Sequence, residues 1–305
     1  MSYATILMAW SVLAGLEGKE TARPADGLAE LGAAVAHLDR IPQGRVEFRR
    51  VRLLPGDRVI EREHVGLFNG ARFRLDVISD SGWDALYQRL GMTPEFLARN
   101  IWDGERVLTV ERDHRILKWS MSDPDRLHTH VFDVRQLGLP LARTIGVSGA
   151  EQYAQDFRLI ERTVEGDLVR VQCLLRRPTN DGDRSLGVGE FVIDPAKGPS
   201  ILSYEISEMA YDTKWTLKGE FTPAQFGKVW FPSYARMEQS SAGGQHDWVQ
   251  EYHVVNADFA TAVPPGELDW AALKLFRGAF IRSDMSGVLG AKWDGQRAVP
   301  YTQFK

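Results

Sequence analysis

The chain has 305 residues, of which 44% are hydrophobic and 26% charged, and this composition is typical of a folded protein with a large buried core. The 37 basic and 41 acidic side chains leave a net charge of −4 with no basic run, which argues against a nucleic-acid partner and against a polybasic membrane patch. Residues 4–16 then form an apolar stretch, ATILMAWSVLAGL, that is too short to span a bilayer as a helix.

This stretch has the length of the apolar core of a secretory signal peptide, although no Lys or Arg precedes it. Two interpretations stay open: residues 1–16 are a signal peptide, or they form an N-terminal core helix. A signal peptide would make the protein periplasmic or exported. A chain with one cysteine has no intrachain disulfide, which is compatible with a bacterial periplasm. No cysteine directly follows the stretch, which excludes a lipid-anchored lipoprotein.

A first helix is predicted over Gly27–Arg40, because apolar residues recur there at helical spacing and Asp26 can cap the first turn. Pro42 and Gly44 end this helix. Strand-length segments joined by turns follow, and they predict one large, mostly antiparallel sheet. The predicted strands are Arg45–Leu54, Arg58–Phe68, Ala71–Val77, Asn100–Trp102, Glu105–Val110, Arg115–Met121, Leu127–Val134, Phe157–Thr163, Asp167–Arg177, Gly187–Ile193, Ile201–Met209, Lys228–Ala242, Gln245–Asn256, Gly278–Asp284, Gly287–Trp293 and Arg297–Thr302.

Asp-Gly turns mark several of the predicted hairpins. Trp102-Asp103-Gly104 recurs near the end of the chain as Trp293-Asp294-Gly295. Asp-Gly between strand residues favours a two-residue hairpin turn in which both central residues have positive φ. Both tripeptides are therefore predicted to connect antiparallel strands.

The segment Ala71–Val77 alternates cleanly between apolar and charged residues. Phe73, Leu75 and Val77 share one side, and Arg72, Arg74 and Asp76 share the other. This pattern predicts a half-buried strand with its charged side in solvent. Residues 81–100 break the strand pattern, and their apolar spacing predicts a short helical insertion between strands.

The last long hairpin can be placed in register from the sequence. If Gly243-Gly244 forms a two-residue turn, Arg236 lies opposite Glu251 and Tyr234 lies opposite His253. One side of the hairpin then carries these polar residues together with Glu238. The other side carries Val229, Phe231, Ala235, Met237, Trp248, Tyr252 and Val254. This apolar side must be buried or must hold an apolar ligand.

Few side chains suggest chemistry. Cys173 shares the apolar side of its strand with Val171 and Leu175, so it is interpreted as a small buried hydrophobe rather than a reactive thiol. His128 and His130 are two residues apart, so both imidazoles could reach one metal ion from a strand. No third ligand is identifiable, and two surface histidines are the simpler interpretation.

Acidic residues are plentiful enough for a glycosidase pair, which needs two carboxyl groups about 5–10 Å apart. The candidates are Glu205, Glu208, Glu220, Glu238 and Glu251. Such pairs also arise by chance on a solvated sheet, and Arg236 opposite Glu251 is more simply a cross-strand ion pair. No Gly-x-Ser-x-Gly elbow occurs, and Gly187-Val188-Gly189 lacks the third glycine of a dinucleotide loop. The sequence predicts no catalytic residue, no metal and no cofactor.

Six short motifs, taken in their order along the chain, are the basis for a resemblance to a known family. They are Gly44–Phe48 (GRVEF), Ile101–Arg106 (IWDGER), Phe132–Leu139 (FDVRQLGL), Val192–Gly198 (VIDPAKG), Lys228–Pro232 (KVWFP) and Ala291–Gly295 (AKWDG). In this order the chain resembles the longer members of the bacterial lipoprotein-sorting-like proteins, the group around the periplasmic lipoprotein carrier. The resemblance covers most of Gly27–Pro300.

The resemblance implies a single half-barrel over residues 17–305, in which helices plug the concave side of a strongly curved antiparallel sheet. It also implies no enzyme activity: family members hold acyl chains of lipids or lipoproteins on the apolar concave side. With this resemblance we predict a cell-envelope binding or carrier protein for an acyl chain, lipid or lipoprotein moiety, with no transmembrane span and a possible envelope protein partner. The predicted ligand-binding residues are Phe73, Leu75, Leu117, Trp119, Trp215, Phe231, Met237, Trp248 and Tyr252, with Leu268–Phe276 as a candidate lid helix.

Two other functions stay open at this point. One is a carbohydrate-active or ester hydrolase on a β-sandwich, which needs the paired carboxylates in a polar cleft. The other is a structural or envelope-sensing interaction module whose concave side is filled by its own side chains. Bound lipid would favour the carrier over both.

Overall fold

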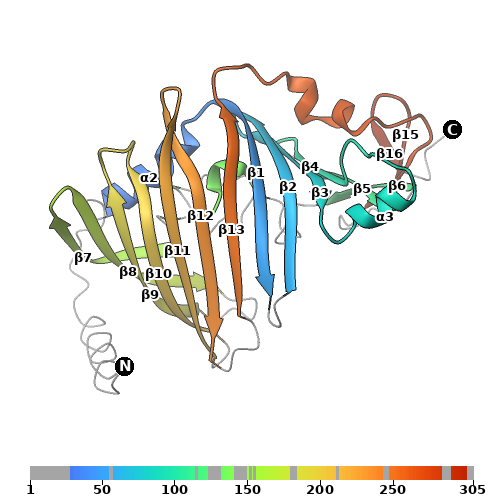
Figure 1. Cartoon of the computed structure of the whole chain (residues 1–305). Helices are drawn as coiled ribbons and strands as arrows, with labels where there is room; N and C mark the ends of the chain where they lie inside the picture. The colour runs from blue at the N-terminus through green and yellow to red at the C-terminus, as the bar shows by residue number, and fades with distance from the viewer. Residues whose placement is uncertain are drawn as a thin grey trace.

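The structure, a computed structural model, describes residues 28–54, 58–113, 116–122, 132–140, 150, 153, 156–178, 184–210, 213–242, 247–283 and 290–300. Over these residues sixteen strands form one strongly curved sheet that is not closed into a barrel (Figure 1). The predicted fold class, a mainly β half-barrel, is therefore confirmed. Within the same residues, no helix is both long and apolar enough to cross a membrane.

Two meanders make up most of the sheet. The first contains β1 (Gln43–Leu54), β2 (Arg58–Asn69), β3 (Arg72–Asp80), β4 (Ala98–Trp102), β5 (Val107–Asp113) and β6 (Ile116–Ser122). The second contains β7 (Phe157–Glu165), β8 (Leu168–Pro178), β9 (Arg184–Asp194), β10 (Ser200–Ala210), β11 (Thr213–Phe226), β12 (Val229–Ser241) and β13 (Trp248–Asp258). Three short strands follow: β14 (Phe280–Ser283), β15 (Ala291–Trp293) and β16 (Ala298–Pro300).

The two meanders are joined by strands far apart in the sequence. β1 pairs with β13 as well as with β2, and both pairings are antiparallel. The chain then adds β14 beside β6 in the parallel direction, so the order runs from β16 through β6 and β1 to β7. Hairpin signals predict neighbours along the chain, but they carry no information on the β1–β13 and β6–β14 contacts.

The first helix, α2 (Ala29–Asp39), is confirmed, and it packs its apolar side against β9 and β10. Leu31, Ala34, Val35 and Leu38 are buried on that side. Leu28 occupies the N-cap position with no side-chain hydrogen bond, whereas Asp26, the expected cap, lies outside the described residues. The His37 imidazole lies 3.1 Å from the Trp230 carbonyl oxygen, which fixes α2 to β12.

The motif over Phe132–Leu139 forms a plug on the same side of the sheet as α2. Its centre is the 3₁₀ helix η3 (Val134–Gln136), which begins where the Asp133 carboxylate accepts a hydrogen bond from the Arg135 backbone N–H at 3.0 Å. The Arg135 guanidinium lies over the Phe68 ring and donates to the Asp39 and Ile41 carbonyls, where α2 ends. The prediction that Leu127–Val134 is a strand is wrong for the described residues 132–134, because this capped turn replaces it.

A strand that the sequence pattern did not predict, β11, lies between β10 and β12. In the sequence, Trp215, Leu217 and Phe221 alternate as in a strand, but Gly219 and Pro223 interrupt this pattern. A bulge at Thr222/Pro223 accommodates the proline, which cannot donate to the ladder. The Tyr204 ring covers Gly219 so closely that a Cβ there would lie 2.2 Å from a ring carbon. The glycine is therefore a packing position within the strand.

The two Trp-Asp-Gly segments connect strands as predicted, but by a different turn. In each, the aspartate side chain accepts hydrogen bonds from the backbone N–H groups two and three residues later, at 2.8–2.9 Å. Only the glycines have positive φ, at 100° for Gly104 and 111° for Gly295. Trp102 pairs with Val107 and Trp293 with Ala298, so four-residue loops replace the expected two-residue turns.

The last long hairpin has the register that the sequence predicts. Arg236 pairs with Glu251, and Tyr234 pairs with His253. The Arg236 guanidinium donates to the Glu251 carboxylate at 2.8 Å, which confirms the cross-strand ion pair. The predicted turn, Gly243-Gly244, lies outside the described residues.

The prediction of a half-buried β3 is wrong, because Arg74 and Asp76 are buried as well as Phe73 and Leu75. Two short 3₁₀ helices, η4 (Pro265–Leu268) and η5 (Trp270–Leu273), cover the charged side of this strand (Figure 1). Asp76 binds both Arg74 and Arg99, and Arg99 donates to the Ala272 carbonyl at 2.6 Å. The charged side of β3 is an internal ion-pair network. The expected insertion over residues 81–100 contains α3 (Asp84–Arg89) and lies between β3 and β4.

Candidate functional site

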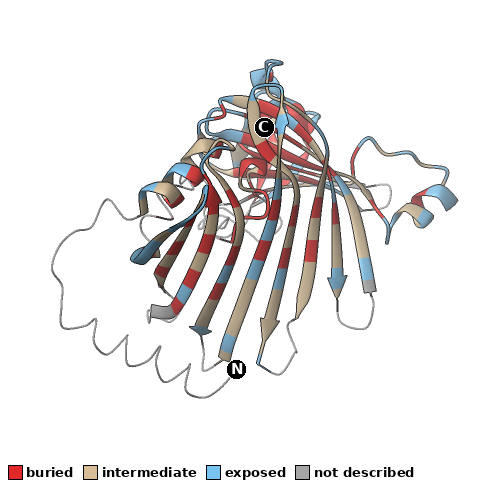
Figure 2. Ribbon diagram, turned by 60° about the vertical axis from the view of Figure 1, so that its left-hand side comes forward, coloured by how far each residue is buried: buried red, intermediate tan, exposed pale blue. Residues whose placement is uncertain are grey.

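The concave face of the sheet, defined here as the face that carries α2 and η3, holds the main apolar core. Buried side chains of both meanders meet on it, because β1 places Phe48 beside Tyr252 of β13. Figure 2 shows buried positions alternating with intermediate and exposed ones along these strands. Several aromatic rings lie against one another there, including Phe48 with Tyr252 and Phe191 with Tyr204.

Most of the residues predicted to bind a ligand lie on this face. Phe73, Leu75, Phe231, Met237 and Tyr252 are buried in the core, and Trp248 packs against it while partly exposed. Trp215 is half-buried on β11, where strand alternation puts it on the same side as Leu217 and Phe221. The structure therefore brings these residues together along one face. Their role in binding remains a prediction.

Trp119 is separated from this group. It lies in a second core with Ile101 and Leu108, on the opposite face of the sheet. Its indole N–H donates to the Leu273 carbonyl at 3.3 Å, and its ring meets Phe276 edge-on with centroids 5.6 Å apart. Leu117 belongs to β6, and its side chain lies outside the described residues.

The predicted lid helix over Leu268–Phe276 is also on the opposite face. It is not one amphipathic helix but the end of η4, the turn η5 and Lys274 with positive φ. Leu268 and Leu273 are buried against the outer side of β2–β6. The prediction that this segment is a lid over the concave face is wrong, because its apolar residues cover the second core on the opposite face.

Three arginines on the concave face form a cluster that the sequence analysis missed. Arg50 and Arg52 of β1 continue the side of the strand that carries Val46 and Phe48, and Arg62 of β2 lies directly opposite Arg50. Arg50 donates to the Gln250 side-chain oxygen at 2.5 Å, and Arg52 lies over the Trp248 ring at 5.8 Å. Arg62 donates to the Asp80 carboxylate at 2.6 Å. We call Arg50, Arg52 and Arg62 the arginine cluster.

His64 lies beside the arginine cluster and is 4% exposed. Its ring stacks on Phe48 with centroids 4.8 Å apart, and neither ring nitrogen has a hydrogen-bond partner. Burial, and then repulsion from Arg50 and Arg62, lower the pKa of His64 to about 3. The imidazole is therefore neutral at physiological pH, with two unpaired polar atoms inside the protein.

One sequence signal could have found this cluster. Along Val46–Arg52 the apolar side of β1 changes from Val46 and Phe48 to Arg50 and Arg52, while Arg49 lies on the other side. Because the two sides of a strand face opposite ways, arginines on both sides place at least one of them on the face that is otherwise buried. Such a change of character within a strand points to a polar region at the end of an apolar face.

The candidate acids do not converge on a cleft. Glu205 forms an ion pair with Lys218 at 3.1 Å, while Glu238 and Glu251 both contact Arg236. Glu205, Glu220 and Glu238 are exposed, whereas Glu208 lies on the same side of β10 as Tyr204 and Ile206. No observation favours a catalytic pair among these carboxylates.

Cys173, His128 and His130 are the other residues whose side chains suggest chemistry. Cys173 is fully buried, and burial raises the pKa of its thiol to about 12, which confirms the interpretation of an unreactive core residue. His128 and His130 lie outside the described residues. Within the part of the chain that the structure describes, no group of three potential metal ligands occurs.

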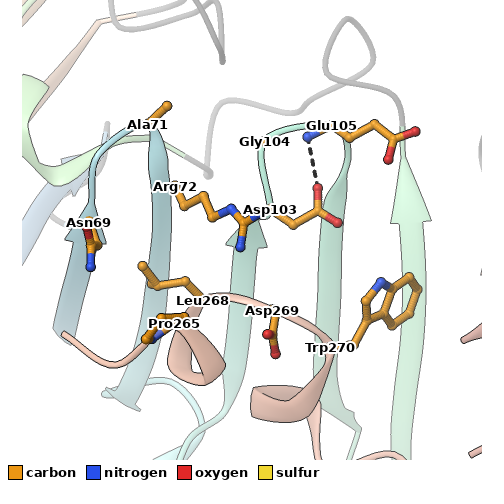
Figure 3. Close-up of a pocket in the computed structure, with 10 residues that line it drawn as sticks. All are labelled: Asn69, Ala71, Arg72, Asp103, Gly104, Glu105, Pro265, Leu268, Asp269 and Trp270. Carbon is orange, nitrogen blue, oxygen red and sulfur yellow. Dashed lines mark hydrogen bonds between the residues drawn. The ribbon is translucent and has the colours of Figure 1, made fainter. Parts of the chain in front are cut away.

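A separate pocket of about 800 Å³ lies beside the turn between β2 and β3 (Figure 3). Residues of the β4–β5 loop and of η4 and η5 line it, among them Asp103, Glu105, Asp269 and Trp270. Figure 3 shows the Arg72 side chain extending across it toward the loop at Asp103. None of the residues predicted to bind an apolar ligand lines this pocket.

No protein-family model matches the chain, and no curated protein sequence matches it. Similar solved structures include a DUF1329 family protein from Desulfovibrio piger, at 9% identity and a TM-score of 0.49, covering 82% of this chain and 100% of that one. They also include a LolA superfamily protein from Nitrosomonas europaea, at 9% identity and a TM-score of 0.49, covering 81% and 98%. A putative outer membrane lipoprotein-sorting protein domain from Vibrio parahaemolyticus has 10% identity and a TM-score of 0.45, covering 82% and 98%.

Proposed function

We propose that this chain is a non-enzymatic binding or carrier protein that holds an acyl chain, or a similar apolar moiety, on its concave face. The observation that carries the proposal is the apolar concave face of one open sheet, which α2 and η3 cover in part. Trp248, Leu217 and Val254 pack at the margin of this core and remain partly exposed. A chain laid along that margin would remove both its own surface and these side chains from water.

The hydrophobic effect is large enough for such binding. Burying one methylene group contributes about 0.8 kcal/mol, so ten contribute on the order of 8 kcal/mol before ordering costs. Before those costs, that free energy would correspond to roughly micromolar affinity. The cargo would be a lipid or an acylated protein, with a partner in the cell envelope that delivers or receives it. The envelope location depends on the apolar stretch over residues 4–16, which lies outside the described residues.

Native mass spectrometry of the full chain, purified from a periplasmic or membrane-associated fraction, tests the proposal. We expect a stoichiometric adduct that extraction identifies as a lipid or an acylated peptide. A mass without adduct, unchanged after incubation with a total lipid extract, would contradict the proposal. That result would favour the interaction module with a self-filled core.

Replacing Trp248 tests the proposed position of the ligand. Trp248→Glu should abolish uptake of a fluorescent fatty acid while the protein stays soluble, because a carboxylate at the core margin opposes burial of an acyl chain. The matched control is Trp83→Glu at the start of α3, where the native side chain is 43% exposed. Equal uptake by both variants would remove Trp248 from the binding site.

A further inference from the structure

The arginine cluster carries more positive charge than the described part of the chain neutralises. Among the described residues, Asp80 is the one carboxylate that contacts any of its three guanidinium groups. The cluster and Asp80 together leave a surplus of two positive charges. Arg50 and Arg62 are directly opposite each other across β1 and β2, an arrangement that destabilises a sheet when both residues carry the same charge.

Burial makes this surplus more costly. Arg50 is 7% exposed, and burial, together with repulsion from Arg62 and Arg52, lowers its pKa even though nearby Tyr252 acts in the opposite direction. The Arg52 Nε atom is buried without a hydrogen-bond partner, as are both ring nitrogens of His64. A buried donor normally has an acceptor, and among the described residues none supplies one to the Arg52 Nε–H group.

The cluster also has access to solvent and to the apolar face. The Arg62 side chain is 32% exposed, and Arg52 is half-buried over the Trp248 ring. Gln250 links the cluster to the core, because it accepts from Arg50 and donates to the Tyr252 hydroxyl. An anion at the arginines would therefore lie next to Trp248 and Tyr252, two of the residues proposed to contact an acyl chain.

We propose that Arg50, Arg52 and Arg62 form an anion subsite for the phosphate of an amphiphilic ligand whose acyl chain lies along the concave face. The guanidinium fork donates two parallel hydrogen bonds to phosphate oxygens, and a phosphate monoester carries about −1.5 to −2 charges near neutral pH, which matches the surplus. The acyl part of this inference depends on the proposed function. The anion subsite itself does not.

The test measures the affinity of the full-length protein for three probes by isothermal titration calorimetry. The probes are a short-chain 1-acyl-glycerol 3-phosphate, the uncharged monoacylglycerol of equal chain length, and inorganic phosphate. We expect the wild type to bind the phosphate lipid at least about tenfold more tightly than the uncharged one, the size expected of one charge-assisted hydrogen bond. Arg52→Gln should remove this preference, so that the two lipids bind with similar affinity.

Two variants control for structure and charge. Arg49→Gln removes the neighbouring arginine on the other side of β1, where it pairs with Glu61, and should keep the preference. Arg52→Lys keeps the positive charge and should retain part of the preference; it substitutes for Arg52→Gln if that variant does not fold.

The probes separate the two proposals. Equal affinity of the wild type for both lipids, or equal loss in Arg49→Gln and Arg52→Gln, would overturn the anion subsite and leave the carrier function standing. Binding of inorganic phosphate that depends on Arg52, without binding of either lipid, would support the subsite and contradict the carrier. Binding of none of the three would contradict both.

Discussion

At the residue scale, His64 shows how the concave face changes from apolar to polar along β2. Its neighbours Phe48, Arg50 and Arg62 provide a ring to stack on and two positive charges, and their effect together with burial outweighs the nearby Asp76 backbone, which favours the protonated imidazole. The pKa of His64 is therefore about 3 in the folded protein and about 6.5 in the unfolded chain. Between these values the unfolded state binds more protons, so the free energy of unfolding falls as the pH falls.

This difference in pKa predicts a specific pH dependence. Replacing His64 by Phe should make the variant gain stability relative to the wild type by about 1.4 kcal/mol per pH unit between pH 6 and pH 4. Urea unfolding of both proteins across this range measures the difference and cancels the titration of the carboxylates they share. A difference that stays constant with pH would show that His64 is protonated to the same extent in the folded and unfolded states.

At the element scale, the chain buries charge where the pattern of β3 predicts exposure. Asp76 accepts from Arg74 at 2.5 Å and from Arg99 at 2.9 Å, and all three side chains are buried. Arg99 then fixes η5 through the Ala272 carbonyl, while Arg74 binds the Glu267 carboxylate in η4. These ion pairs hold the segment from Pro265 to Leu273 against the outer face of the first meander.

Removing the Asp76 carboxylate, which Arg74 and Arg99 share, should therefore strongly destabilise the attachment of η4 and η5 to the sheet. Asp76→Asn removes the buried carboxylate that Arg74 and Arg99 share and leaves them, among the described residues, only the exposed carboxylates of Glu267 and Glu95, and the loss of a buried partner typically costs about 3–5 kcal/mol. Urea unfolding measures it, and Glu105→Gln is the control, since Glu105 is an exposed partner of Arg106 whose loss should cost a few tenths of a kcal/mol. If both variants lose equally little, the network does not hold η4 and η5 in place.

At the scale of the whole molecule, β1 is the central strand that joins the two meanders. It lies between β2 and β13, whereas β7 ends the sheet and exposes most of its side chains. Amides in the centre of a sheet open mainly through global unfolding, and those at an edge open locally. The pairing of β1 with β13 therefore predicts a gradient of protection across the sheet.

Hydrogen exchange with mass spectrometry measures this gradient. Peptides from β1 and β13 should exchange slowest, and peptides from β7 and from β16 should exchange fastest. The comparison is internal, because all peptides come from one sample. Protection of β7 equal to that of β1 would mean that β7 is covered, by residues outside the described part of the chain or by a second molecule.

The local pattern of the sequence was sufficient to predict many of the secondary-structure elements. Alternation and turn residues predicted most strands, the register of the β12–β13 hairpin, the helix α2 and the burial of Cys173. These features depend on residues close in the chain, whose spacing determines which side of a strand or helix each side chain occupies. The aspartate-capped turn η3 and the interrupted strand β11 were missed, because one hydrogen bond or one proline changed the local pattern.

Only the tertiary structure determined the features that position the candidate site. The pairing of β1 with β13 places Arg50 beside Tyr252, and the return of the chain at η4 and η5 buries the charged side of β3. Trp119 and Trp248 have similar sequence patterns, yet they lie on opposite faces of the sheet. Alternation along a strand separates its two sides but does not specify which side faces the inside of the curve. That choice depends on contacts between segments far apart in the chain, where burial of the whole apolar surface outweighs local preference.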